Sequence, residues 1–274
     1  MCVMRYRFPL SLQTTLPDDY RENGALLSLL KTLRGLGFLG VELNMSDPRS
    51  FQREAIEEFL GRHDLRLSML AIGLTAKRLG LSLSHPDELV RRRSVDICRH
   101  LIDWVAGSGT GVIVGFLKGG VAPDTEEART RFARSLAEVL PHAAEKSVAV
   151  LIEVTNRYES SVANTIEEAA ACLQPHGTAY AQLLPDTFHM NIEEANMFAS
   201  LDRHRERFRS FHLSDNNRFF PGFGAIDFDR ILRFLMERGY RGQLAIEGNV
   251  RADIEGELRA SVARLAPLLE IRDG

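Results

Sequence analysis

The sequence predicts an α/β protein built as a single (β/α)8 TIM barrel over residues 1–274. The length of 274 residues is one observation, because such barrels typically take about 250 residues. A second is the alternation of strand-like and helix-like segments without a linker, which is typical of a parallel sheet surrounded by helices. The third is a run of four apolar segments in the second half that each end in a carboxylate or an imidazole.

The first half is expected to contribute four strands, each a short apolar run bounded by turn residues. These strands are placed at Tyr6–Leu12, Phe38–Leu43, Leu65–Ile72 and Gly111–Phe116. Helices are placed between them, from the spacing of apolar residues, at Asn23–Leu36, Arg49–His63, Pro86–Ala106 and Thr125–Lys146. Pro9 interrupts the first strand and suits a strand end or a bulge. A long connection, Gly73–Ser84, precedes the third helix.

The second half continues the alternation with four more strands, expected at Val148–Glu153, Ala179–Leu184, Phe208–His212 and Gly242–Glu247. The helices after them are placed at Thr165–Leu173, Ile192–Ser200, Asp227–Arg238 and Ile254–Leu269. Thr165 and Glu168 form a capping box, and Gly239 marks a helix end. The longest loop of this half is Leu213–Ile226.

Composition limits the function classes. A net charge of −3 gives no overall attraction to nucleic acid or to an anionic membrane, so neither is expected as a partner. No apolar run approaches the ~20 residues of a membrane-spanning helix, and the N-terminus lacks the apolar core of a signal peptide. Cys2, Cys98 and Cys172 are scattered, as expected for reduced thiols. A cytoplasmic protein is therefore expected.

The four polar strand ends are expected to share one location. Active sites of such barrels lie at the carboxyl ends of the strands, so Glu153, Asp186, His212 and Glu247 should meet on half of the rim. Three carboxylates and one imidazole are typical ligands of Mn²⁺, Mg²⁺ or Co²⁺, whereas structural zinc sites are usually rich in thiolates. Any one of them alone would be read as a helix cap or a polar loop residue. Four at corresponding positions favour a metal site.

The motifs around these residues resemble a known family. They are LIEVTNRYE ending at Glu159, DTFHMNIEE beginning at Asp186, His212 followed six residues later by Arg218, and IEG at Glu247. The chain resembles the sugar isomerase/epimerase family of xylose isomerase-like barrels, and most closely ketose 3-epimerases of the D-tagatose/D-psicose type. The second half matches motif by motif, and the first half matches mainly in architecture.

The resemblance implies a role for each of these residues. Glu153, Asp186, His212 and Glu247 would bind one divalent metal ion, Mn²⁺ by preference, with Mg²⁺, Co²⁺ or Zn²⁺ as alternatives. Glu153 and Glu247 would also be the catalytic acid and base. Glu159, His189 and Arg218 would bind the oxygens of a small sugar or sugar phosphate. This list describes a metal-dependent epimerase that inverts C3 of a ketose by removing and returning its proton.

Other functions fit parts of the pattern. An aldose–ketose or hydroxypyruvate isomerase would differ in the carbon that loses its proton, and a lyase of the inosose or dehydroshikimate dehydratase type would use the same metal. An endonuclease IV-like nuclease is disfavoured because it needs histidines at the ends of the third and fourth strands. Those ends read Ala71-Ile72-Gly73 and Gly115-Phe116-Leu117.

Several residues keep a structural alternative. Arg218 could pair with Asp215, His189 could cap the following helix, and Glu159 could compensate a helix dipole. Glu42 at the end of the second strand is expected to support the site or the fold. Two sets of residues keep two interpretations each. Lys77, Arg78 and Lys118 could bind an anion, but solvated surface charge is favoured for them. Phe219, Phe220 and Phe223 could form a lid or a homo-oligomer contact.

Overall fold

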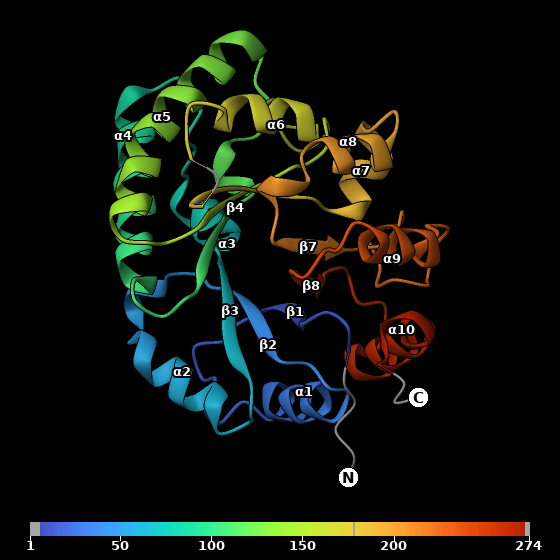
Figure 1. Ribbon diagram of the computed structural model, residues 1–274. Helices are drawn as coiled ribbons and strands as arrows, with labels where there is room; N and C mark the ends of the chain where they lie inside the picture. Colours follow the sequence, from blue (N-terminus) through green and yellow to red (C-terminus); the bar gives the residue numbers. More distant parts are fainter. Residues whose placement is uncertain (1–5, 178, 272–274) are drawn as a thin grey trace.

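The computed structural model describes residues 6–177 and 179–271, and within them eight strands form one parallel sheet (Figure 1). The strands are β1 Leu10–Thr15, β2 Gly40–Asn44, β3 Arg66–Ala71, β4 Gly111–Val114, β5 Val150–Glu153, β6 Ala181–Leu184, β7 Ser210–Leu213 and β8 Gln243–Ile246. Their spatial order is β6-β5-β4-β3-β2-β1-β8-β7. The predicted single (β/α)8 TIM barrel is therefore confirmed.

The seam between β6 and β7 closes the barrel. Asp186 and His212 form a parallel bridge there, and the His212 N–H donates to the carbonyl oxygen of Pro185 over 2.9 Å. The Thr187 hydroxyl donates to the carbonyl oxygen of Ser214 over 2.5 Å and accepts from the Ser214 N–H over 2.8 Å. The barrel is thus closed between β6 and β7 by side chains and loop backbone rather than by a strand ladder.

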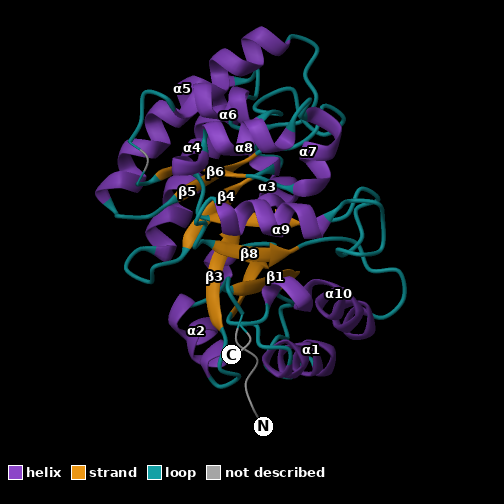
Figure 2. Ribbon diagram, turned by 45° about the vertical axis from the view of Figure 1, so that its right-hand side comes forward, coloured by secondary structure: helices purple, strands orange, loops and turns teal. Residues whose placement is uncertain are grey.

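Helices surround the barrel on its outside (Figure 2). They are α1 Gly24–Gly35, α2 Arg53–Gly61, α3 Gly73–Leu79, α4 Glu88–Val105, α5 Thr125–Glu145, α6 Ile166–Leu173, α7 Thr187–Glu193, α8 Met197–Arg203, α9 Phe228–Glu237 and α10 Ile254–Leu269, with short 3-10 turns η1 Pro48–Ser50, η2 Phe116–Lys118 and η3 Arg205–Arg207. Polar side chains start many of them. Thr165, for example, accepts from the Glu168 N–H, as the capping box predicted.

The apolar core has two layers because strand residues alternate between the two faces of the barrel wall. Leu151 belongs to a small cluster with Ala71, Ile113 and Leu184, which is separate from the large apolar core between sheet and helices. Ile152, its neighbour on β5, belongs to that large core. Both faces of the strands are thus apolar, which explains why the sequence shows continuous apolar runs rather than alternation.

Several predicted segments differ from the structure. The first strand begins at Leu10 rather than Tyr6, because Pro9 lacks an N–H for the ladder. Tyr6 instead forms an isolated antiparallel β-bridge with Glu270. The connection Gly73–Ser84 contains helix α3. The helix expected at Ile192–Ser200 is divided into α7 and α8, because Asn196 begins a new helix by accepting from the Ala199 N–H. The last helix, Ile254–Leu269, has the predicted bounds.

Some sequence expectations concern the chain as a whole. Cys98 and Cys172 are free thiols, while Cys2 lies outside the described residues. Within the described part, no helix is long and apolar enough to cross a membrane. That residues 1–274 form one domain stays a prediction.

Candidate active site

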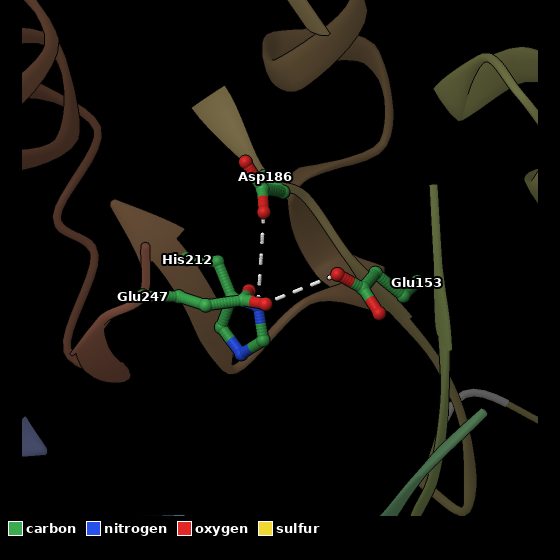
Figure 3. A group of neighbouring side chains, drawn as sticks. All are labelled: Glu153, Asp186, His212 and Glu247. Carbon is green, nitrogen blue, oxygen red and sulfur yellow. Dashed lines mark ion pairs between the residues drawn. The ribbon is translucent and has the colours of Figure 1, made fainter. Parts of the chain in front are cut away.

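Four side chains from successive strands of the second half converge at the carboxyl end of the barrel (Figure 3). Glu153 is the last residue of β5, Asp186 follows β6 as the N-cap of α7, His212 lies in β7, and Glu247 follows β8. One ligand atom from each lies within 4.8 Å of those of the others. The structure therefore brings together the four residues that the sequence placed on one rim.

The imidazole of His212 is at the centre of this cluster. Its Nδ1 lies 3.5 Å from Glu153 Oε1 and 2.7 Å from Glu247 Oε2. Its other ring nitrogen, Nε2, lies 2.8 Å from Oε2 of Glu42, whose side chain is fully buried. Because a carboxylate only accepts, Nε2 must donate, so the lone pair of the neutral ring is on Nδ1 and faces the cluster. Glu42, for which the sequence predicted a supporting role, thus orients the imidazole of His212 toward the cluster.

The donor set fits a divalent metal ion. Nδ1 of His212 and Oε2 of Glu247 are buried and 2.7 Å apart, but neither atom makes a hydrogen bond of proper geometry with any described residue. Burial alone would lower the pKa of His212, but the carboxylates of Glu42 and Glu247 raise it well above its ordinary range. Positive charge is therefore favoured at this point. Three oxygen donors with one nitrogen suit Mn²⁺, Mg²⁺ or Co²⁺, and Zn²⁺ accepts the same ligand types.

Arg218 lies against the same carboxylates. Its guanidinium donates to Asp186 Oδ2 and to Glu247 Oε1, both over 2.6 Å. Burial alone would lower the pKa of Arg218, but Glu247 and Asp186 hold it above its usual range. The backbone at Arg218 is left-handed, with φ of 63°, which a non-glycine residue adopts only where its surroundings hold it.

The loop that presents Arg218 is held by Asp215, which is fully buried. Its carboxylate accepts the N–H groups of Gly222, Gly224 and Ile226. Asp215 is thus committed to the loop backbone, and the alternative of an ion pair between it and Arg218 is wrong. Of the aromatic residues in this loop, Phe220 is a buried core residue.

His189 and Glu159 are joined through Asn156, a residue that the sequence did not single out. The Asn156 amide nitrogen donates to Glu159 Oε1 over 3.0 Å and lies 2.9 Å from His189 Nδ1. With Nδ1 as acceptor, the neutral His189 ring carries its proton on Nε2, which lies 4.0 Å from Asp186 Oδ2. His189 is inside α7 and buried, so it is not a terminal cap, whereas Glu159 is exposed.

A cavity of about 130 Å³ lies over these groups. Gly115 makes room on one side, because a Cβ at this position would overlap Oε2 of Glu153. Phe116, which is 47% exposed, supplies an aromatic wall of this cavity. The lining consists of Gln13, Asn44, Ala71, Ile72, Gly73, Ile113, Gly115, Phe116, Gly119, Glu153, Thr155, Glu159, Ser160, His189, Arg218 and Glu247.

Lys118 corrects the expectation of a solvated or anion-binding charge. The side chain is fully buried, and its Nζ donates to Glu153 O over 2.6 Å, Thr155 Oγ1 over 3.0 Å and Ala163 O over 2.9 Å. Burial lowers the pKa of Lys118 to about 7, opposed by the nearby Glu153 carboxylate. The ammonium thus fixes the backbone of Glu153 from behind. Lys77 and Arg78 are exposed and outside the cavity lining.

These features define a class of protein: a (β/α)8 barrel with a carboxylate–histidine cluster and an arginine on its carboxyl rim. Residues 30–268 match the family described as xylose isomerase-like TIM barrel. The chain belongs to this family, as its motifs predicted.

Individual proteins agree with this assignment. A ketose 3-epimerase from Arthrobacter globiformis is 31% identical over 228 residues, which cover 82% of this chain and 77% of that protein. A 3-dehydro-D-guloside 4-epimerase from Escherichia coli is 33% identical over 111 residues, or 40% of this chain and 42% of that protein. The crystal structure of D-psicose 3-epimerase with D-tagatose from Clostridium cellulolyticum shares the fold, with a TM-score of 0.80 and 21% identity over 96% of this chain and 100% of that one.

Proposed function

We propose that this protein is a divalent-metal-dependent epimerase that inverts C3 of a ketose. The broader class, a carbohydrate isomerase or epimerase, is confirmed by relatives named as sugar epimerases. The choice of C3 is supported by the ketose 3-epimerase relative, which the chain matches over most of its length.

One observation carries the mechanism: two carboxylates approach a single point from different sides. Glu153 and Glu247 come from β5 and β8, with β6 and β7 between them on the closed rim. Both carboxylates extend toward Nδ1 of His212, at 3.5 Å and 2.7 Å (Figure 3). Inversion of a carbon needs a base on one face of the substrate and an acid on the other. This pair meets that requirement when a substrate lies between the two.

The other residues bind and orient the sugar. Arg218 and the Nε2–H of His189 would donate hydrogen bonds to the oxygens that gain negative charge as C3 loses its proton. Glu159, at the exposed mouth of the cavity, would accept a hydrogen bond from a substrate hydroxyl. Lys118 would keep the Glu153 strand end in place while that carboxylate exchanges a proton. When bound by Glu153, Asp186, His212 and Glu247, the metal ion would supply Lewis-acid polarisation of the substrate carbonyl.

Exchange of hydrogen with solvent tests this proposal. The protein, loaded with Mn²⁺, is incubated with a ketose in D₂O, and NMR locates the deuterium in the product. We expect label at C3 and nearly complete incorporation, because one carboxylate removes the proton and the other delivers a deuteron from solvent. Label at C1 would identify an aldose–ketose isomerase, label at C4 a 4-epimerase, and an unsaturated product a lyase. Each of these results overturns C3 epimerisation.

Variants assign the two carboxylates. Glu153→Gln and Glu247→Gln should each abolish epimerisation, and Glu206→Gln, at an exposed position in η3, is the matched control. Metal binding is measured separately by elemental analysis. The double substitution Asp186→Ala with His212→Ala should leave the protein without bound metal. Wild-type metal content in that variant would contradict the assigned ligand set, and wild-type turnover in either Glu→Gln variant would contradict the two-base mechanism.

A further inference from the structure

The cavity has a charged half and a neutral half. The lining residues that follow β5 to β8 include Glu153, Glu159, Arg218 and Glu247, which hold its formal charges. The lining residues from β1 to β4 and the turns after them are neutral. A substrate whose reacting carbon lies between Glu153 and Glu247, with its carbonyl end at Arg218 and His189 as proposed, would extend its remaining carbons toward the neutral half.

Two carboxamides stand in this neutral half. Gln13 on β1 pairs in register with Glu42 on β2, two residues before Asn44. Both Gln13 and Asn44 line the cavity. The Gln13 carboxamide has no hydrogen-bond partner among the described residues, although the residue is partly buried. It can donate and accept at the same time, which matches a hydroxyl group.

Asn44 is already held in one orientation. Its Oδ1 accepts the Leu74 N–H over 2.8 Å, at the start of α3. The Nδ2 end is therefore the free one, and it lies 3.7 Å from the place where a Cβ on Gly73, itself a lining residue, would be. A fixed donor thus faces the same region as the unpartnered carboxamide of Gln13.

On the basis of the proposed function, we propose that Gln13 and Asn44 form a subsite that hydrogen-bonds hydroxyl groups on the carbons of the ketose beyond the reacting centre. The subsite selects an uncharged polyol tail. A phosphate would be buried there without a cationic partner, because Lys118 is committed to three acceptors and neither Lys77 nor Arg78 lines the cavity. The open choice between a sugar and a sugar phosphate is thereby resolved in favour of the sugar.

The test compares substrates on matched variants. A ketohexose, its 5-deoxy and 6-deoxy analogues and its 6-phosphate are assayed with wild type, Gln13→Leu and Asn44→Asp. Leucine removes the hydrogen bonds at nearly the same volume. Aspartate keeps the acceptor that Leu74 uses but replaces the amide donor by a second acceptor and adds one negative charge. Gln174→Leu, at an exposed position at the end of α6, is the control for a Gln→Leu change.

We expect wild type to prefer the ketohexose over at least one deoxy analogue by about tenfold in kcat/KM, because a missing hydroxyl leaves an amide unpaired. In Gln13→Leu or Asn44→Asp, kcat/KM should fall by a similar factor for the ketohexose and stay unchanged for that analogue. The 6-phosphate should react at least tenfold more slowly than the free sugar. Equal losses on all substrates, or a 6-phosphate used as well as the free sugar, would overturn the subsite.

Failure of the subsite is distinguishable from failure of the proposed function. Calorimetric binding of the unreactive 3-deoxy ketose to the Mn²⁺-loaded protein reports on the subsite without any turnover. If wild type epimerises ketoses but the variants discriminate between the ketohexose and its analogues as wild type does, only the subsite is wrong. If wild type binds the 3-deoxy ketose more tightly than Gln13→Leu but exchanges no C3 hydrogen, only the reaction is wrong. Absence of both binding and exchange overturns both.

Discussion

Glu42→Gln should weaken metal binding although it removes none of the four metal-ligand side chains. In the wild type, Oε2 of Glu42 lies 2.8 Å from His212 Nε2, and its Oε1 accepts from the Gln243 amide over 2.7 Å. The carboxylate fixes the ring orientation and keeps the lone pair on Nδ1. A glutamine has one oxygen for these two donors, and it has lost the charge that strengthens the bond to the imidazole.

The size of the effect follows from the single interaction that changes. A hydrogen bond to a charged group contributes about 1.5–3 kcal/mol, and 1.4 kcal/mol corresponds to a factor of ten. We therefore expect the dissociation constant for Mn²⁺ to rise about 12- to 140-fold. This range agrees with the roughly 10- to 100-fold losses that follow removal of a carboxylate behind a ligating histidine.

The assay is a titration of metal-free protein with Mn²⁺ in competition with a chelator, with circular dichroism as a check on folding. Gln243→Leu is the matched control, because it removes the second partner of Glu42 and leaves the contact with His212 in place. The control should change metal affinity much less than Glu42→Gln. A Glu42→Gln variant that binds Mn²⁺ within twofold of wild type, or a control that binds as weakly, would refute the orientation argument.

Three further predictions concern neighbouring groups. Arg218→Ala should lower kcat about 10²- to 10³-fold by losing a donor to substrate oxygens, yet retain or raise Mn²⁺ affinity because a competing cation has gone; weaker metal binding would contradict this. Lys118→Met should lower kcat, because the carbonyl oxygens of Glu153 and Ala163 and the hydroxyl of Thr155 lose the donor that holds the end of β5 in place; wild-type kcat in a kinetic assay would contradict this positioning role. For Glu193, burial raises the pKa but the Arg157 ion pair outweighs it and the pKa is lowered. Its stabilising effect is thus present above the ordinary range near ~4.3 and lost as pH falls below it. Between pH 5 and 3 the melting temperature of Glu193→Gln should therefore fall less than that of wild type, and equal falls would show that the pair contributes nothing.

The sequence predicted the four residues of the candidate metal cluster because the carboxyl ends of all strands in a parallel barrel lie on the same rim. Glu153, Asp186, His212 and Glu247 needed only the strand assignment and the rule that strand ends share a rim. Their position in the chain was therefore sufficient, even where boundaries were misplaced by a few residues. His189 was found through its motif, although the helix that contains it was not predicted there.

The residues that support the site were harder to predict because their roles depend on packing across the barrel. Glu42 and His212 are 170 positions apart, and nothing local to either residue indicates that contact. Lys118 was misread because a lysine beside glycines is usually solvated. Gly119, at φ of 123°, leaves no room for a Cβ beside the hydroxyls of Ser82 and Ser84, and this close turn accompanies the inward-facing lysine.

The position of the site also follows from how the barrel closes. Strand ladders join every neighbouring pair except β6 and β7, where the bridge between Asp186 and His212 completes the circle among the described residues. Both of these residues belong to the candidate metal cluster, and they face each other across the seam. A metal ion held by the two would therefore join the strands at the point with the least backbone pairing. Binding would stabilise the closed barrel as well as prepare the site for substrate, because a ligand that binds only the folded state favours it.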